Sequence, residues 1–250
     1  MAHGQRHFPW LTEFDIAHRG LFEAGTEREE NTLAAVQAAV DGGYAVEIDV
    51  RTTVDDIVVV FHDELLDRMT NGTGAVSTWG FRQLRDEFTV GNSGKPIPSL
   101  PDVLDTVDRE RPLFVEIKSS RRRSPQKVCA GVRHAFEGYG GPVAVMSFDP
   151  RVVQWFGDYM PKYARGLVIG REFLLSMKAR IALMFWVRKC KPDFIACDVN
   201  LLPNSFCTSW RNKGKPLLTW TVRDKKMEAI AREHADAIIF EKPAVVEEQD

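Results

Sequence analysis

The chain has 250 residues, of which 44% are hydrophobic and 27% are charged, and its net charge is -2 at neutral pH. These values are ordinary for a globular protein and lack the strongly basic balance that nucleic-acid-binding proteins carry, so we expect no nucleic-acid partner. No Ser/Gly tract, long charge run or low-complexity block divides the chain, which predicts one domain over residues 1–250.

Residues 1–8 contain no apolar core of signal-peptide length. The four cysteines (Cys129, Cys190, Cys197 and Cys207) lack the close spacing of a zinc or redox motif. They are more simply read as free thiols in a reducing compartment. We therefore predict a cytoplasmic protein, and no feature of the sequence fixes its oligomeric state.

Short β-rich runs alternate with stretches of helical period along the whole chain. Strands are predicted at 14–18, 44–50, 113–118, 142–147, 163–169, 193–197, 216–221 and 236–240. Helices are predicted at 31–41, 100–110, 124–138, 149–159, 171–189, 204–213 and 223–234. This alternation indicates parallel strand pairing. Eight strand–helix units in a chain of this size predict an α/β fold, a closed (β/α)₈ TIM barrel.

The spacing departs from this regularity between the second and third of these strands. Segment 52–99 is longer than one crossover helix requires and contains the apolar run Ile57–Phe61. The pair Asn71-Gly72 is a strong turn signal. We predict a small insertion after the second strand, on the active-site face of the barrel, rather than an independent domain.

Segment 173–187 is apolar but is interrupted by Lys178 and Arg180. Its length falls short of the roughly 20 residues that span a bilayer. It is predicted to be an outer helix that packs on the sheet. The alternative, a basic amphipathic surface that contacts lipid, stays open.

Three carboxylates lie in runs that otherwise resemble buried strands. Glu47 and Asp49 belong to the second strand and Glu116 to the third. Alternate residues of a strand share a face, and barrels of this type place their chemistry at the carboxyl ends of the strands. Because a buried carboxylate is costly without compensation, we predict a hard divalent cation, Mg²⁺ or Ca²⁺, rather than zinc. A structural layer of ion pairs with Arg51 and Lys118 is the alternative.

Two histidines and two cations accompany these acids. His18 ends the first strand, just before the turn that Gly20 allows, and His62 follows the run Ile57–Phe61. Two histidines suit a reaction that removes one proton and supplies another. Arg19 and Lys118 suit an anion, most naturally a phosphate.

Taken together, these segments resemble the glycerophosphodiester phosphodiesterase family of TIM barrels. The matching segments run in family order over nearly the whole chain: His18-Arg19-Gly20, Glu30-Asn31-Thr32, Glu47-Ile48-Asp49-Val50, Val60-Phe61-His62-Asp63, Asp67 to Gly74, Ile97 to Leu100, Glu116-Ile117-Lys118, Ser147-Phe148 and Trp220-Thr221-Val222.

The resemblance implies metal-dependent hydrolysis of a small-molecule glycerophosphodiester to glycerol 3-phosphate and an alcohol. It implies Glu47, Asp49 and Glu116 as metal ligands. It also implies His18 and His62 as the acid–base pair, Arg19 and Lys118 as phosphate contacts, and Trp220 as an apolar wall of the pocket.

The sequence departs from the family pattern at two places. Glu29 stands where the family often has proline, and Glu241 stands near the position of a family aspartate. Both departures concern the fit of the substrate rather than the type of reaction. Two other functions remain open: a phospholipase D-like enzyme that acts on lysophospholipids or sphingolipids, and a binding barrel without catalytic activity.

Overall fold

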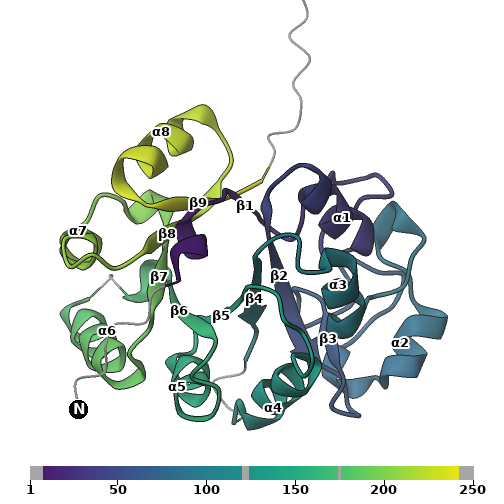
Figure 1. Cartoon of the computed structure of the whole chain (residues 1–250). Coiled ribbons are helices and arrows are strands. Elements are labelled where there is room, and N and C mark those ends of the chain that lie inside the picture. Colours follow the sequence, from purple (N-terminus) through teal and green to yellow (C-terminus); the bar gives the residue numbers. More distant parts are fainter. Residues whose placement is uncertain (1–7, 120–123, 174–175, 242–250) are drawn as a thin grey trace, which may run out of the picture.

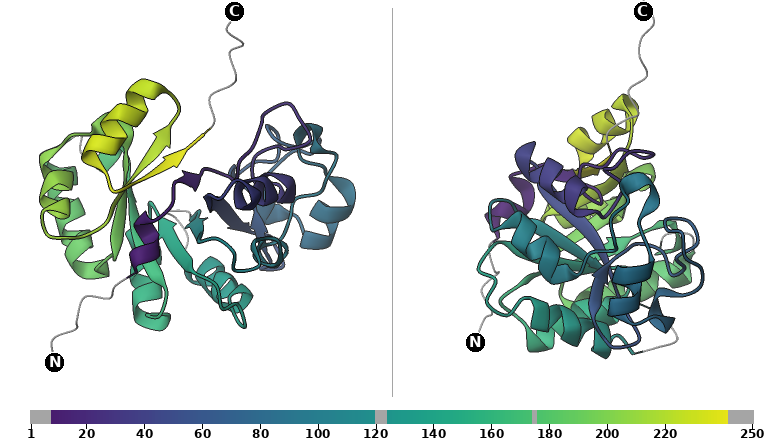
Figure 2. Two further views of the ribbon diagram at one scale, coloured as in Figure 1. Left: turned by 45° about the horizontal axis from the view of Figure 1, so that its top comes forward. Right: turned by 90° about the vertical axis from the view of Figure 1, so that its right-hand side faces the viewer.

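The computed structural model describes residues 8–119, 124–173 and 176–241. Its nine strands form one sheet, in which eight parallel strands close into a barrel because β1 pairs with both β2 and β9. Figure 2 shows these first and last strands side by side. The strands are β1 (Ile16–Ala17), β2 (Ala45–Thr52), β3 (Val58–Val60), β4 (Leu113–Ile117), β5 (Val143–Ser147), β6 (Ala164–Ile169), β7 (Phe194–Asp198), β8 (Leu217–Val222) and β9 (Ala237–Phe240). The predicted TIM barrel is confirmed.

Helices surround this barrel (Figure 1). They are α1 (Leu33–Asp41), α2 (Phe81–Glu87), α3 (Leu100–Val107), α4 (Gln126–Ala135), α5 (Pro150–Tyr159), α6 (Met177–Cys190), α7 (Ser205–Arg211) and α8 (Lys225–His234). Side-chain caps fix where several of them begin. Thr32 and Ser99, for example, each accept a hydrogen bond from a backbone N–H in the first turn of the helix that follows.

Side chains of the strands alternate between two apolar layers. One layer fills the inside of the barrel and includes Ile16, Ala45 and Phe114. A short 3-10 helix, Pro9–Thr12, contributes the buried Leu11 to the same layer. The other layer packs between the sheet and the helices. Because Ala45 belongs to the inner layer, Glu47 and Asp49 on the same strand also face inward.

Segment 52–99, the expected insertion, runs from the end of β2 to Ser99, the residue before α3. Its strand β3 pairs antiparallel with the end of β2, with Val60 opposite Val50. This segment has an apolar cluster of its own, built on Val59, Phe61 and Leu84. The carboxyl end of β2 is therefore extended by a second layer of chain, which also delivers His62.

Three element boundaries differ from the predictions for visible reasons. Strand β1 has only two residues, since Asp15 lies outside it and pairs with Arg232 at 2.6 Å. Helix α1 begins two residues later than expected because Asn31 adopts a left-handed φ of 59°. Helix α3 ends at Val107, since Asp108 has a φ of 39°.

The apolar segment 173–187 does not form the single helix that was expected over 171–189. A 3-10 turn covers Arg171–Phe173 and α6 follows, while residues 174–175 lie outside the described part, as does most of the N-terminal segment used to predict the compartment. None of the described helices combines the length and the hydropathy needed to cross a membrane. The four cysteines are buried free thiols.

Candidate active site

The three predicted acids meet at the carboxyl end of the barrel. Asp49 lies beside Glu116 in the register of β2 and β4. Glu47 and Asp49 are fully buried, and Glu116 is 6% exposed. One carboxylate oxygen from each of the three residues lies within 4.8 Å of the others. The three carboxylates therefore lie close together at a buried position, where water does not screen the repulsion between them.

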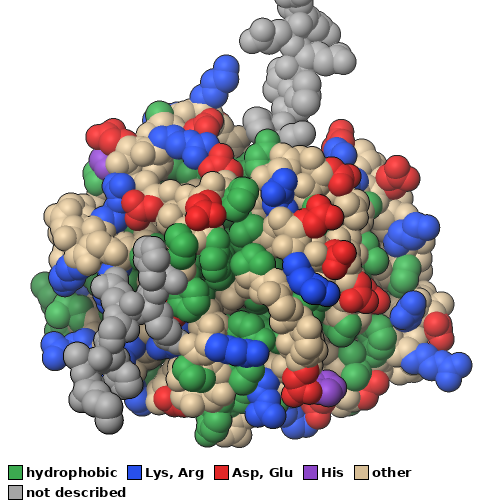
Figure 3. All heavy atoms as spheres, viewed as in Figure 1, with side chains coloured by type: hydrophobic (Ala, Val, Ile, Leu, Met, Phe, Trp, Pro, Cys, Tyr) green, Lys and Arg blue, Asp and Glu red, His purple; other side chains and the backbone are tan. Residues whose placement is uncertain are grey.

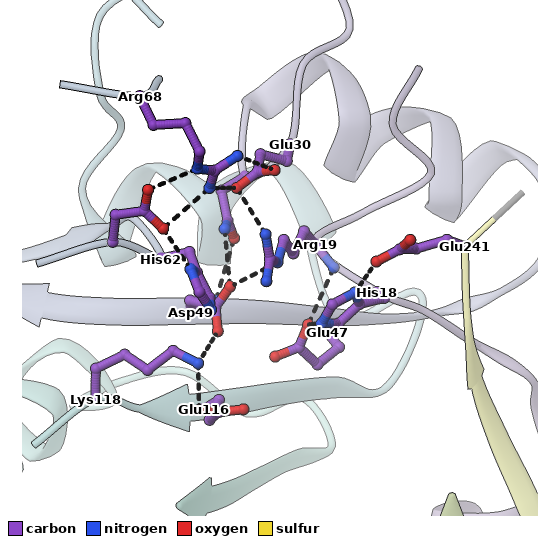
Figure 4. Close-up of polar contacts among 12 residues, drawn as sticks. His18, Arg19, Glu30, Glu47, Asp49, His62, Arg68, Glu116, Lys118 and Glu241 are labelled. Carbon is purple, nitrogen blue, oxygen red and sulfur yellow. Dashed lines mark hydrogen bonds and ion pairs between the residues drawn. The ribbon is translucent and has the colours of Figure 1, made fainter. Parts of the chain in front are cut away.

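Compensation of these charges is uneven. The Lys118 Nζ lies 2.8 Å from Asp49 Oδ1 and also contacts Glu116, and Arg19 Nε lies 3.3 Å from Asp49 Oδ2 (Figure 4). Burial alone would raise the pKa of Asp49, but Lys118 and Arg19 outweigh it and hold that pKa well below its ordinary value. Asp49 is therefore ionised throughout the neutral range.

Glu47 has the opposite balance. Burial, followed by the charges of Asp49 and Glu116, raises its pKa well above the ordinary value. Its Oε2 accepts the backbone N–H of Arg19 at 3.0 Å. Its Oε1 is buried and accepts no hydrogen bond from the described residues. A buried carboxylate oxygen without a donor is the position at which a cation would supply the missing interaction.

A purely structural layer of ion pairs does not account for this cluster. Among the described residues, Arg51 forms no ion pair with the three acids; its Nε donates to the carbonyl of His62 at 2.8 Å. Three carboxylates with one unpartnered oxygen fit a hard divalent cation. Of the alternative layer of ion pairs, the contacts of Lys118 are observed and those of Arg51 are not, since Arg51 holds the carbonyl of His62 instead.

Backbone conformations that few residues tolerate place the donors around the acids. Arg19 and Gly20 both have positive φ, and the Gly20 N–H donates to the Glu47 carbonyl at 3.1 Å. Asn31, also left-handed, donates its amide to Asp49 Oδ2 at 3.0 Å and accepts the Asp49 N–H at 3.1 Å. Such strained positions persist where the surrounding structure enforces them, and they cluster at functional sites.

Each histidine is held by a carboxylate that is itself held by an arginine. His18 Nδ1 lies 2.7 Å from Glu241 Oε1, and the other oxygen of Glu241 accepts Arg223 Nε at 2.6 Å. These hydrogen bonds outweigh burial and lower the pKa of Glu241 to about 2. The Nε2 of His18 is left to face the acids, 3.9 Å from Glu47 Oε2.

His62 repeats this arrangement from a different part of the chain. Its Nδ1 lies 2.6 Å from Asp63 Oδ1, and Asp63 Oδ2 accepts Arg68 Nε at 2.6 Å. The hydrogen bond from Arg68 is the main cause that lowers the pKa of Asp63 to about 2. Burial, assisted by Lys118 and Arg19, lowers the pKa of His62.

The two histidines line one small cavity of about 150 Å³. Arg19, Glu47, Glu116, Lys118 and Trp220 also line it. Asp49 does not reach it and instead contacts Lys118 and Arg19. A second cavity, of about 520 Å³, shares Glu116, Lys118 and Phe148 with the first. Seven of the eight predicted site residues thus line one cavity, and the eighth, Asp49, contacts two of the seven.

Trp220 lines this cavity. Its ring contacts Phe148 edge-on, with 5.3 Å between the ring centroids, and its Nε1 donates to the Ala196 carbonyl at 3.1 Å. Tethered in this way, the indole is a fixed apolar surface beside the polar groups.

Several residues of the site escaped the sequence-based reasoning. Glu30 accepts hydrogen bonds from Arg19 and Arg68, while Thr32 caps α1. Asp63, next to His62, was a visible signal. Glu241 was noted only as a departure from a pattern, since its partner lies 223 residues away in the chain.

The chain matches a family model over residues 18–245, and that model describes the glycerophosphoryl diester phosphodiesterase family. A glycerophosphodiester phosphodiesterase of Caldanaerobacter subterraneus is 28% identical over 91% of this chain and 93% of its own length. The human glycerophosphodiester phosphodiesterase 1 is 32% identical over 83% of this chain and 71% of its own.

Solved structures agree on the fold. A phosphodiesterase of Oleispira antarctica, crystallised with the product sn-glycerol-3-phosphate, superposes with a TM-score of 0.79 at 21% identity and covers 92% of this chain and 93% of its own. A glycerophosphodiester phosphodiesterase of Thermotoga maritima superposes with a TM-score of 0.72 at 23% identity, over 94% and 96% of the two chains. The chain therefore belongs to the glycerophosphoryl diester phosphodiesterase family, a family of hydrolases.

Proposed function

We propose that this protein hydrolyses glycerophosphodiesters to glycerol 3-phosphate and an alcohol, with His18 and His62 as the acid–base pair. Family membership supports the reaction. The observation that carries the assignment of roles is the pair of histidines on one cavity, each with Nδ1 held by a carboxylate. In both rings Nε2 is the nitrogen left for the substrate, so one ring can accept a proton while the other donates one.

The cations would hold the phosphate between these rings. Arg19 and Lys118 line the same cavity and carry positive charge beside the acids. They would neutralise charge that develops on the non-bridging oxygens. Trp220 would cover the apolar side of the glycerol. The reaction consumes one water molecule: one histidine would remove a proton from the attacking oxygen while the other supplies a proton to the leaving alcohol.

Glu47, Asp49 and Glu116 would hold a divalent cation, Mg²⁺ or Ca²⁺, which fits their clustered oxygens. When bound, such an ion polarises a phosphoryl group and lowers the pKa of a coordinated hydroxyl. Lys118 would keep Asp49 ionised and available as a ligand. The unpartnered Oε1 of Glu47 is the clearest support for this role.

The test is an assay of glycerol 3-phosphate release from glycerophosphocholine with Mg²⁺, with Ca²⁺ and with a chelator. We expect activity that depends on a divalent ion and that falls by about two to four orders of magnitude in His18→Ala and in His62→Ala. Metal binding, measured by calorimetry, should persist in both variants. Wild-type turnover in either variant would refute the acid–base assignment. A binding barrel without activity would release no product under any condition.

A lysophospholipid substrate is the second candidate. The 520 Å³ cavity beside the acids is lined by the aromatic side chains of Phe148, Phe173 and Trp186, which suit an apolar chain better than a small polar alcohol. Comparing kcat/KM for glycerophosphocholine and lysophosphatidylcholine separates the two. A preference for lysophosphatidylcholine that Trp186→Ala removes would favour this candidate, while equal or lower activity on it would exclude it.

A further inference from the structure

The outer face of α6 carries an unusual combination of exposed apolar and basic side chains. Met177, Ile181, Met184 and Phe185 are 57–69% exposed. Their spacing along a helix of 3.6 residues per turn places all four on one face. We call these four residues the α6 stripe. The inner face of the helix packs against the barrel, where Leu183 and Cys190 are buried.

Cations flank the α6 stripe on both sides. By helical geometry, Lys178 and Lys189 lie along one edge, Arg180 along the other, and Arg188 continues the stripe itself. All four are exposed. Helix α6 contains no Asp or Glu. Figure 3 shows hydrophobic and basic side chains next to one another at the lower left, where Figure 1 places α6.

The basic character continues across the groove between α6 and α7. This groove encloses about 700 Å³. The described residues that line it include no carboxylate and five cations: Arg180, Arg188, Lys191, Lys213 and Lys215. The chain as a whole has more acidic than basic residues, 35 against 33. A face so free of acids in a weakly acidic protein is complementary to a negatively charged surface.

From this face we infer that the protein docks on an anionic phospholipid bilayer, with the α6 stripe in the headgroup region and the surrounding cations on the lipid phosphates. Apolar side chains on one face with Lys and Arg around them are the pattern of a helix that lies in the plane of a membrane interface. Each basic residue adds to the affinity for the bilayer because the surface potential of an anionic leaflet is negative.

Helix α6 also lies beside the 520 Å³ cavity. Helix α6 follows β6, so its first turn lies at the carboxyl end of the barrel, where the acids are. The side of α6 away from the stripe contributes Ala182 and Trp186 to the 520 Å³ cavity, which also includes Glu116 and Lys118. One helix therefore separates the proposed lipid contact from the catalytic groups. The docking itself does not depend on the proposed reaction.

The test is co-sedimentation of the full chain with vesicles of equal parts phosphatidylcholine and phosphatidylserine, against vesicles of phosphatidylcholine alone. We expect binding to the mixed vesicles that weakens as salt is raised. Ile181→Ser with Phe185→Ser should reduce affinity about tenfold or more, since their apolar area would no longer be buried. Arg180→Gln with Arg188→Gln should reduce it about fivefold for each charge removed, or about 1 kcal/mol each.

Matched substitutions elsewhere provide the controls. Val54→Ser removes an apolar side chain that is 60% exposed, like the 59% of Ile181, but lies in the segment between β2 and β3. Arg82→Gln with Arg109→Gln removes two exposed charges from other elements. These controls should bind as the wild type does. The thermal midpoint of every variant should match the wild type, which shows that the fold is intact.

Two results would overturn the inference. Equal binding to both vesicle types, or none to either at low salt, would remove the role of anionic lipid. A dimer in sedimentation velocity that Phe185→Ser dissociates would mean that the α6 stripe is an interface between two copies of the chain.

Discussion

A histidine that transfers protons needs one ring nitrogen free and the other held by a hydrogen bond. Both histidines of the site have this arrangement. His18 and His62 differ in their surroundings but share the arrangement in which a carboxylate holds Nδ1 and an arginine holds the carboxylate. Such an arrangement fixes both the tautomer and the orientation of the ring. Glu241 and Asp63 are therefore positioning residues in the proposed reaction.

Replacing Glu241 should separate positioning from binding. Glu241→Gln keeps the shape of the side chain but weakens the hydrogen bond to His18 and the ion pair with Arg223. We expect kcat to fall about 10- to 100-fold, with KM nearly unchanged, and Glu241→Asp to recover part of the loss. Glu228→Gln, a matched change on the surface of α8, should have no effect. A change confined to KM would contradict the positioning role.

The contacts of individual residues were harder to predict from the sequence than the helices, the strands or the fold. Glu47, Asp49 and Glu116 could be found because a carboxylate in an apolar strand is conspicuous. Glu241 could not, since nothing near it in the chain indicates a partner 223 residues away. Arg51, a counter-ion only in the alternative interpretation, contacts the His62 carbonyl instead, because alternation along β2 gives the face of its Cα but not the path of a long side chain.

At the level of elements, one turn after β1 places the backbone that surrounds the acids. Gly20 has a φ of +79°, and a Cβ there would lie 2.6 Å from the carbonyl carbon of Ala35 in α1. The helix thus packs directly against the turn, with no room for any side chain. This contact holds the Arg19 N–H toward Glu47.

Alanine substitutions at two glycines with nearly the same φ distinguish the cost of the left-handed backbone conformation from the cost of a steric clash at Cβ. Gly25 has a φ of +82° and open space at its Cβ position. Gly25→Ala should therefore cost only the left-handed conformation, about 1–2 kcal/mol. Gly20→Ala should cost clearly more, because α1 must also shift, and it should lower activity as well. Urea denaturation of both variants measures the difference; equal losses would show that the packing against Ala35 has no effect.

Strands were well predicted where an apolar run was long enough to be buried on both faces, as a barrel strand is. The run Val143–Met146 in β5 is an example. Boundaries failed where a single residue adopts a left-handed conformation, as Asn31 and Asp108 do. The antiparallel pairing of β3 with β2 was also unforeseen, since an apolar run does not reveal its neighbour.

For the whole molecule, the proposed metal site predicts that an added divalent cation raises stability. Without an ion, Glu47 is a buried carboxyl with a raised pKa beside two other acids. A bound divalent cation should stabilise the native state by about 2.7 kcal/mol at a concentration of 100 times Kd. The thermal midpoint should then rise by about 5–10 °C. Glu47→Gln should abolish most of this rise and leave the metal-free midpoint no lower than that of the wild type.

Calorimetric scans with Mg²⁺, with Ca²⁺ and with a chelator measure this effect. Glu228→Gln should keep the full response to the ion. If the Glu47→Gln variant responded to the ion as the wild type does, Glu47 would not be a ligand.

Acid should destabilise the fold through the two carboxylates that hold the histidines. The pKa values of Asp63 and Glu241 are lowered to about 2 from ordinary values of 3.8 and 4.5. A lowered pKa contributes stability that is fully present above the ordinary value and is lost as pH falls through the folded value. Urea midpoints of the wild type should therefore fall between pH 4.5 and 2. Asp63→Asn with Glu241→Gln should show a shallower fall over the same range, and an equally steep one would contradict this origin.

Closure of the barrel joins the first strand to the last, so the support of His18 depends on the end of the chain. The His18 N–H donates to the carbonyl of Phe240, and its ring is held by the next residue. The first histidine therefore gains its support only when β9 has paired with β1. Turnover should require this final strand, and a chain that ends before it should hydrolyse no substrate.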